Sequence, residues 1–98
     1  MLKTIIRGTT PTIQFTFKEV DVSDVTTAYL NIGTIEKDLS TATVGDDTIS
    51  WTLSQSETLG LSGLRTTVQL NWKTGDGTRG ASEAVQVEIA ENAKNEVI

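Results

Sequence analysis

The sequence predicts an all-β protein, a single immunoglobulin-like antiparallel β-sandwich of about seven strands with one short helical turn. Three observations lead to this prediction. Apolar residues recur at every second position in several short runs, as they do in strands with one buried face. Glycine and aspartate, which favour turns, separate these runs. Threonine, valine and isoleucine, whose branched side chains suit a pleated sheet, are abundant.

The clearest element is a hairpin near the C-terminus. Residues 66–73 and 83–89 each alternate between apolar and polar side chains, and the glycine-rich segment 74–80 joins them. Such a pattern predicts two antiparallel strands with a long polar tip. The inward-facing residues expected in the two strands are Val68, Leu70, Trp72, Val85, Val87 and Ile89.

Five further strands are predicted before this hairpin. They span residues 2–7, 13–17, 28–32, 35–39 and 49–53, with a short edge piece expected at residues 40–44 and a hairpin turn at residues 45–47. Pro11 follows the first of these strands, and because it lacks an amide proton it fits best at the start of a strand or on an edge. Residues 19–24 are acidic and turn-like, and within them Val20 and Val22 are expected to continue the inward face of the second strand.

The helical turn is predicted at residues 54–59. Ser54 and Glu57 have the spacing of a capping box, in which each side chain accepts a hydrogen bond from the backbone of the other residue. This turn would carry the chain from one sheet to the other. Val85, Ile89, Ala93 and Val97 are also four residues apart, so a C-terminal helix is an alternative. The strict alternation of residues 83–89 favours the strand, which leaves residues 91–98 as a tail with a loose end.

Composition narrows the function. The 98 residues are read as one domain, and 13 acidic against 8 scattered basic side chains give a net charge of −5, which argues against nucleic acid as a partner. No apolar run approaches the roughly 20 residues that span a bilayer, and no secretion signal is evident. We therefore expect that the chain is made in a cytoplasm and does not contact a membrane. The absence of cysteine and histidine removes disulfides, thiolate sites and the commonest general base.

Four patterns suggest chemistry and are interpreted structurally. Residues 75–80 fit the dinucleotide-binding pattern G-x-G-x-x-G, but this motif needs a following helix and residues 83–89 alternate like a strand. The aspartates of the turns at residues 46–47 and 76 lack the spacing of a calcium loop. Ser54 beside Glu57 is a helix cap, because no histidine can activate the hydroxyl. Glu36 and Asp38 form an exposed pair on a solvent face. We therefore assign no catalytic, metal or cofactor residue and expect neither an enzyme nor a small-molecule substrate.

A resemblance adds a biological context. The run RGTTPT at residues 7–12 precedes an alternating strand, TISWTLSQSETL occupies residues 48–59, and Asp76-Gly77 comes shortly before Ala81-Ser82. Together these runs resemble small phage and prophage proteins of clostridial-type Gram-positive bacteria. More loosely, the chain is similar to the N-terminal sandwich of siphophage upper baseplate proteins. The resemblance covers nearly the whole chain and implies a virion, with no catalytic residues to carry over.

These observations predict a non-enzymatic structural module of a tailed phage virion, in the tail, the baseplate or the head decoration. It would be made in the host cytoplasm and would contact other phage structural proteins, with copies of the chain forming a homo-oligomer. A phage-encoded inhibitor of a host protein, or a module that binds cell-surface carbohydrate, remains an alternative. The residues expected to contact a partner are Leu2, Ile5, Arg7, Arg79, Val97 and Ile98.

Overall fold

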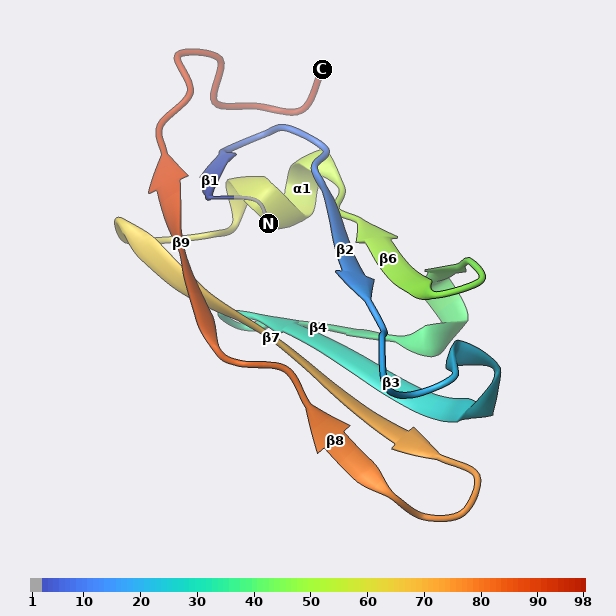
Figure 1. The fold of residues 1–98 in the computed structure, drawn as a ribbon. Helices are drawn as coiled ribbons and strands as arrows, with labels where there is room; N and C mark the ends of the chain where they lie inside the picture. The colour runs from blue at the N-terminus through green and yellow to red at the C-terminus, as the bar shows by residue number, and fades with distance from the viewer. Residues whose placement is uncertain (1–2) are drawn as a thin grey trace.

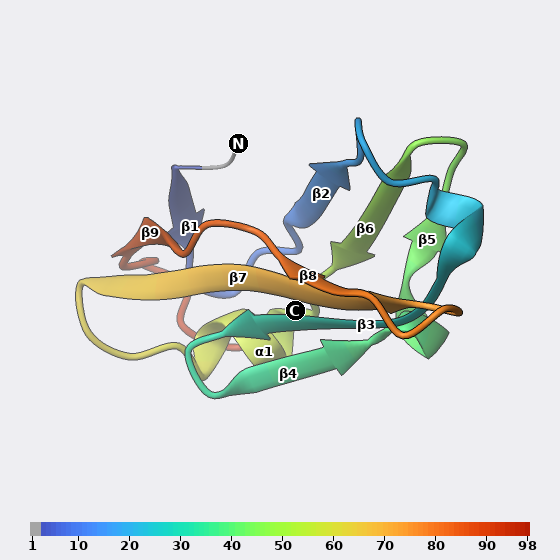
Figure 2. The ribbon, with the colours of Figure 1, turned by 60° about the horizontal axis from the view of Figure 1, so that its bottom comes forward.

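Two β-sheets packed face to face enclose an apolar core in the computed structural model, which describes residues 3–98 (Figure 1). The larger sheet contains, in order, β1 (Thr4–Ile6), β9 (Val85–Ala90), β7 (Arg65–Thr74), β3 (Val25–Ile32) and β4 (Ile35–Asp38), with β8 (Arg79–Ala81) paired to β7. The smaller sheet contains β2 (Thr12–Thr16), β6 (Thr48–Thr52) and β5 (Thr43–Val44). Figure 2 shows the three strands of the smaller sheet as a layer over β7, β3 and β4.

This strand order confirms the predicted immunoglobulin-like sandwich. The larger sheet corresponds to the sheet built on strands G, F and C of that fold, and the smaller sheet to strands B, E and D. Residues 3–98 form nine strands where about seven were predicted, because the short edge piece expected at residues 40–44 contains a strand, β5, and because β8 forms largely within the segment predicted as the hairpin tip. One pairing also differs from the antiparallel expectation, since β1 lies parallel to β9.

The predicted C-terminal hairpin is confirmed. β7 pairs antiparallel with β9 through its first half and with β8 through its second half. Ser82 interrupts the partner strand: the Leu70 amide donates to the Ser82 hydroxyl at 2.9 Å, and the Ser82 amide donates to the Leu70 carbonyl at 2.8 Å. The hydroxyl thus replaces a backbone acceptor where the ladder breaks. Residues 85–90 are strand, so the alternative of a C-terminal helix is wrong.

The alternating apolar side chains of both sheets meet in one core. Its buried members include Ile13, Leu30, Ile32, Ile49, Trp51, Val68, Leu70 and Val87. The indole N–H of Trp51 donates to the Asp38 carbonyl at 2.8 Å, so this large side chain is buried without an unpaired donor. Trp72 packs against the core but remains partly exposed, so the expectation that both tryptophans are inward-facing core residues is only partly met.

The segment after β2 forms a turn, as the acidic, turn-like residues 19–24 predicted. Val22–Asp24 form a 3-10 turn, and the Asp21 carboxylate accepts hydrogen bonds from the Ser23 amide and hydroxyl. Val22 is nevertheless buried, as its inward parity suggested. A second 3-10 turn, Leu39–Thr41, follows β4 and is capped in the same way by Asp38. Aspartate two residues before a free amide favours such turns over strand continuation.

The predicted helical turn is α1 (Gln55–Leu59), which connects the smaller sheet to the larger one. Both hydrogen bonds of the capping box are present: the Glu57 amide donates to the Ser54 hydroxyl at 3.1 Å, and the Ser54 amide donates to the Glu57 carboxylate at 2.9 Å. Lys37 of β4 forms an ion pair with the same carboxylate at 2.9 Å. Burial raises the pKa of Glu57, but the Ser54 amide and Lys37 together outweigh it, so the net shift is downward.

Thr58 of α1 fixes the crossover between β1 and β2. Its side chain is fully buried, and its hydroxyl accepts from the Gly8 amide at 2.9 Å and donates to the Thr9 carbonyl at 2.8 Å. One hydroxyl therefore satisfies a backbone donor and a backbone acceptor of the segment that changes sheets.

The C-terminal tail is attached, contrary to the prediction of a loose end. The Gln55 side-chain amide donates to the Ile98 carbonyl at 3.1 Å, and the Ile98 amide donates to the Gln55 side-chain oxygen at 2.8 Å. The Asn92 side chain donates to the Arg7 carbonyl at 2.9 Å. The tail is therefore held at both ends.

Replacing Thr58 with valine tests the role of the hydroxyl. Thr58→Val keeps the size and branching of the side chain but leaves the Gly8 amide and the Thr9 carbonyl without a partner. We expect the free energy of unfolding to fall by about 1–3 kcal/mol, measured by urea denaturation. Thr67→Val, at an exposed position of β7, is the matched control and should change stability by no more than about 0.5 kcal/mol. Equal effects of the two substitutions would contradict the role assigned to Thr58.

Candidate docking site

The smaller sheet has an uncovered edge at β2. Among residues 3–98, β2 pairs only with β6, because β1 pairs with β9 on the other sheet. In the four-stranded sheet of a constant-type immunoglobulin domain, strand A lies beside strand B. Here β2 occupies the position of B, and no strand of the described chain takes the position of A.

The direction of the backbone groups along this edge follows from the pairing with β6. At one end of β2 the Leu53 amide donates to the Pro11 carbonyl at 2.9 Å, and at the other end the Phe17 amide donates to the Asp47 carbonyl at 2.7 Å. In an antiparallel ladder, every second residue directs both backbone groups to the same neighbour. The odd-numbered residues therefore face β6, and the amides and carbonyls of Thr12, Gln14 and Thr16 point to the uncovered side.

This edge also lacks charge. Residues 9–17 contain no acidic or basic side chain. The other sheet edges are different. β4 carries Glu36, Lys37 and Asp38, and β1 is only three residues long between Lys3 and Arg7. β5, at the far edge of the smaller sheet, is only two residues long. Charged or very short edge strands discourage pairing with another chain, whereas a neutral one permits it. β2 is thus the edge best suited to accept a strand.

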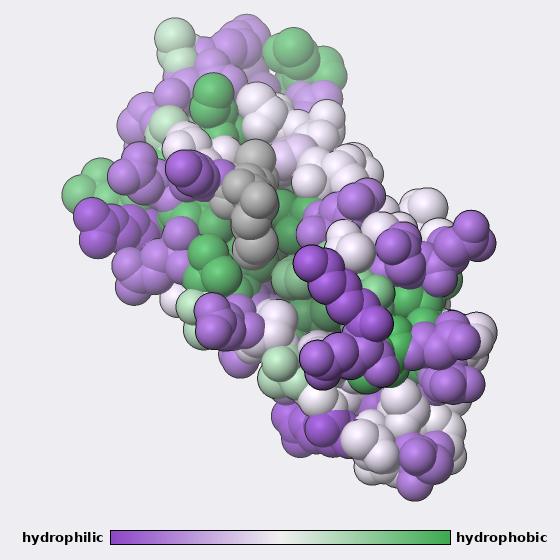
Figure 3. Space-filling model, in the orientation of Figure 1, coloured by the Kyte–Doolittle hydropathy of each residue, from purple (hydrophilic) through white to green (hydrophobic). Residues whose placement is uncertain are grey.

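An apolar cleft opens beside the end of β2. It has a volume of about 420 Å³ and is lined by Phe15, Thr16, Phe17, Lys18, Glu19, Val20, Leu70, Trp72 and Ser82. Figure 3, drawn from the side of Figure 1, shows apolar surface between the hydrophilic side chains of this face. A strand added to β2 would direct every second side chain toward the gap between the sheets, where this cleft lies.

Trp72 forms one wall of the cleft and rests on Gly80. The two residues are opposite each other on β7 and β8, and a Cβ atom at Gly80 would overlap the indole ring. Phe17 packs edge-to-face on the same indole, with ring centroids 5.1 Å apart and an interplanar angle of 77°. Gly80 is thus required for packing, and because it lies in a strand, the dinucleotide-binding interpretation of residues 75–80 stays rejected.

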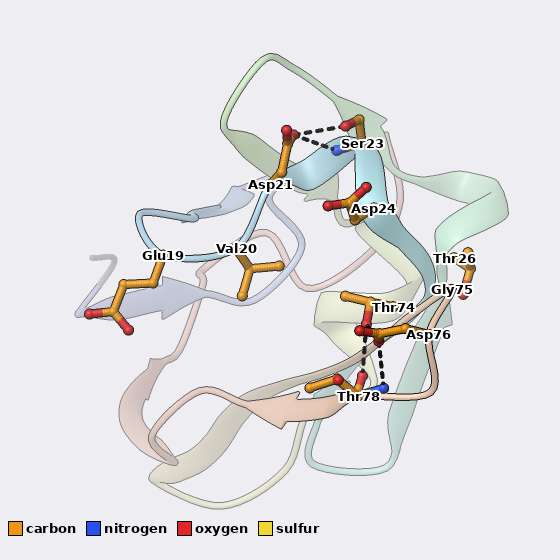
Figure 4. Close-up of a pocket in the computed structure, with 10 residues that line it drawn as sticks. All are labelled: Glu19, Val20, Asp21, Ser23, Asp24, Thr26, Thr74, Gly75, Asp76 and Thr78. Atoms are coloured by element: carbon orange, nitrogen blue, oxygen red, sulfur yellow. Dashed lines mark hydrogen bonds between the residues drawn. The ribbon is translucent and has the colours of Figure 1, made fainter.

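A larger cleft, of about 590 Å³, lies between the segment after β2 and the tip of the C-terminal hairpin (Figure 4). Its carboxylates serve local turns. Asp76 accepts from the Thr74 hydroxyl at 2.5 Å and from the Thr78 amide at 3.0 Å, and these bonds lower its pKa to about 2. Hydrogen bonds from Ser23 likewise lower the pKa of Asp21. The described residues contain no cluster of three or more acidic side chains placed to hold a metal ion. We therefore regard the smaller apolar cleft as the candidate site.

The predicted contact residues do not form one surface. Leu2 lies outside the described residues. Ile5 is only 1 % exposed, so the prediction of a surface contact is wrong for this residue: its side chain belongs to the core. Arg7 forms an ion pair with Glu91, with 3.5 Å between Arg7 Nε and Glu91 Oε1. Val97 and Ile98 are 55 % and 84 % exposed in the C-terminal tail, whereas Arg79 is on β8, at the opposite end of the molecule (Figure 1).

Sequence reasoning missed the edge of β2. The signal that could have found it is the uncharged run at residues 9–17, in a chain where charged residues make up 21 % of the sequence. The neutral run alone does not identify an edge, however, because a central strand would look the same.

Comparisons with protein-family models, curated proteins and solved structures found no match for this chain. None of the helices in the described part of the chain has the length and apolar character needed to cross a membrane.

Replacing Gly80 tests the wall of the cleft. Gly80→Ala introduces a methyl group where the indole of Trp72 lies, so Trp72 must move. We expect a loss of about 1–3 kcal/mol of stability and a change in tryptophan fluorescence. Gly75→Ala is the control, because a Cβ atom there would meet Thr26 at an ordinary contact distance of 3.6 Å. Unchanged fluorescence and stability in Gly80→Ala would show that the ring does not rest on this glycine.

The lowered pKa of Asp76 predicts a dependence of stability on pH. Its carboxylate is charged in the folded state down to about pH 2, while its ordinary pKa is 3.8. The stabilising contribution of the charge is therefore complete above the ordinary value and is lost as pH falls through about 2. The difference in melting temperature between the wild type and Asp76→Asn should be constant above about pH 5 and should shrink toward pH 2. A difference that stays constant down to pH 2 would contradict this account.

Proposed function

We propose that this chain is a non-enzymatic docking module that binds a neighbouring protein by accepting an extended strand at β2. The observation that carries the proposal is the uncovered, uncharged edge of β2, along which the amides and carbonyls of Thr12, Gln14 and Thr16 face outward. Addition of a strand to a sheet edge is a common mode of recognition, in which backbone hydrogen bonds supply affinity and pockets for alternate side chains supply specificity.

The cleft supports this mode of binding. A strand placed antiparallel to β2 would complete the four-stranded sheet that an immunoglobulin-like sandwich can form. Its inward side chains would cover Phe15, Phe17 and Trp72, which are only partly buried. The apolar area removed from water would contribute at about 25 cal/mol per Å², in addition to the hydrogen bonds along the edge.

We further propose that the module acts in the virion of a tailed phage, where it contacts other structural proteins. The resemblance of residues 7–12 and 48–59 to small phage proteins supports this context. A virion presents many copies of each interface, so a contact that is weak in isolation becomes strong through avidity. A strand-addition site on a small sandwich suits such an assembly.

The test is incorporation of the chain into particles. We expect mass spectrometry of virions purified from a host that carries the encoding prophage to detect the wild-type chain. Gln14→Pro removes the outward amide of β2 without removing a bond to β6, and an edge strand tolerates such a proline. This variant should fold, as judged by thermal melting, and should be lost from particles. Gln14→Ala keeps the amide and should be retained.

Two results would contradict the proposal. Absence of the wild-type chain from particles, despite its expression in the lysate, would exclude a virion role. Retention of folded Gln14→Pro at the wild-type level would show that the edge of β2 is not the docking element.

A further inference from the structure

The strand that best fits the edge of β2 is another β2, and we propose that two copies of this chain pair through it across a two-fold axis. This inference rests on the proposed docking role of the edge and identifies its occupant. An interface of this kind is isologous, so the same patch must be complementary to itself. The properties of residues 9–17 meet this requirement in three respects.

The first respect is hydrogen bonding. When two antiparallel copies of β2 are centred on Gln14, Gln14 lies opposite its own equivalent and Thr12 lies opposite Thr16 of the second copy. All three residues direct their amides and carbonyls outward, so each opposing pair is a hydrogen-bonded pair that exchanges two bonds. About six hydrogen bonds would then join the copies, and every outward group of β2 would be used.

The second respect is charge. Each copy has a net charge of −5, so two copies repel each other unless they meet where charge is absent. Residues 9–17 satisfy this condition over the whole length of a sheet edge, since they contain no charged side chain, whereas β5, the other uncharged edge of the smaller sheet, is only two residues long. Self-pairing of β4 would instead place Glu36, Lys37 and Asp38 at the contact.

The third respect is the fit of the side chains. On the outer face, Thr12 would meet Thr16 of the second copy, and threonine hydroxyls already pair across the sheet within one copy, where Thr12 and Thr52 are 2.9 Å apart. On the inner face, the same register places Phe15 opposite Ile13 and Phe17 opposite Pro11 of the second copy. The partly exposed aromatic side chains beside the cleft would thereby be covered.

The pairing would join the two smaller sheets into one continuous sheet, in the order β5-β6-β2 followed by β2-β6-β5 of the second copy. The larger sheets would remain separate. The two uncovered edges of β2, which are the strongest template for non-specific pairing in each copy, would both disappear.

Cysteine crosslinking tests the register directly, because the natural chain contains no cysteine. Opposing Cα atoms of a hydrogen-bonded pair are about 5.5 Å apart, within the span of a disulfide. Oxidised Gln14→Cys should therefore convert from monomer to covalent dimer. Ser50→Cys is the matched control: Ser50 is opposite Gln14 on β6, so its thiol faces the same side but lies one strand away from the contact. It should remain monomeric.

Mixed crosslinking and light scattering complete the test. A mixture of Thr12→Cys and Thr16→Cys should give the heterodimer, whereas Thr12→Cys alone should give none. The mass of the uncrosslinked wild type should double with increasing concentration, and that of Gln14→Pro should not.

The inference is overturned if the wild type remains monomeric, if Gln14→Cys and Ser50→Cys crosslink equally, or if Gln14→Pro still dimerises. A monomeric wild type that enters particles, while Gln14→Pro does not, would overturn the second copy as occupant and leave the docking proposal standing.

Discussion

The buried hydroxyl of Thr58 is the contact on which the arrangement of the strands depends. It holds the Gly8 amide and the Thr9 carbonyl, and so fixes the point at which the chain leaves the larger sheet and enters the smaller one. Two further features stabilise the same crossover. Gly8 adopts a positive φ of 81° and lies close to the Leu59 side chain, and the Asn92 side chain donates to the Arg7 carbonyl. Because the crossover occurs here, β1 pairs with β9, and β2 begins without a neighbour on its outer side.

The open edge and the apolar cleft are two consequences of that single arrangement. A first strand placed beside β2 would cover both the backbone of Gln14 and the aromatic side chains next to it. Since β1 lies on the other sheet, the gap between the sheets stays open near Phe17 and Trp72. The Trp72 ring packs on Gly80, which holds the indole in place as one wall of this opening. An unsatisfied edge next to an unfilled apolar cleft is what strand addition requires.

Local patterns in the sequence predicted the elements they govern. The alternation around Leu70 and Val87 predicted the hairpin, and the spacing of Ser54 and Glu57 predicted the helix cap, because both depend on residues close in the chain. The parallel partner of β1 was not predictable in this way, since it is set by residues more than 80 positions away. Adjacent Ile5 and Ile6 also left the inward parity undecided, and the structure buries Ile5 while exposing Ile6.

The candidate site also combines a feature set by residues close in the chain with one set by long-range pairing. The absence of charged side chains is visible in residues 9–17 of the sequence. The position of these residues at a sheet edge, however, depends on a long-range pairing that no local pattern encodes. The glycine pattern at residues 75–80 is the reverse case, because a local motif suggested a phosphate site and the strand pairing of Gly80 with Trp72 explains the glycine instead. The sequence alone was enough to reject the phosphate site, whereas the reason for a glycine at position 80 requires knowledge of its strand neighbour.

Residue-resolved amide hydrogen exchange of β2, measured by NMR on dilute and concentrated samples, tests the central claim most directly. The account predicts slow exchange for Ile13 and Phe15 at both concentrations, because their amides face β6. It predicts fast exchange for Gln14 in the dilute sample and slow exchange in the concentrated one. Slow exchange of Gln14 in a dilute monomer would contradict the account, because it would show that the chain itself covers the edge of β2.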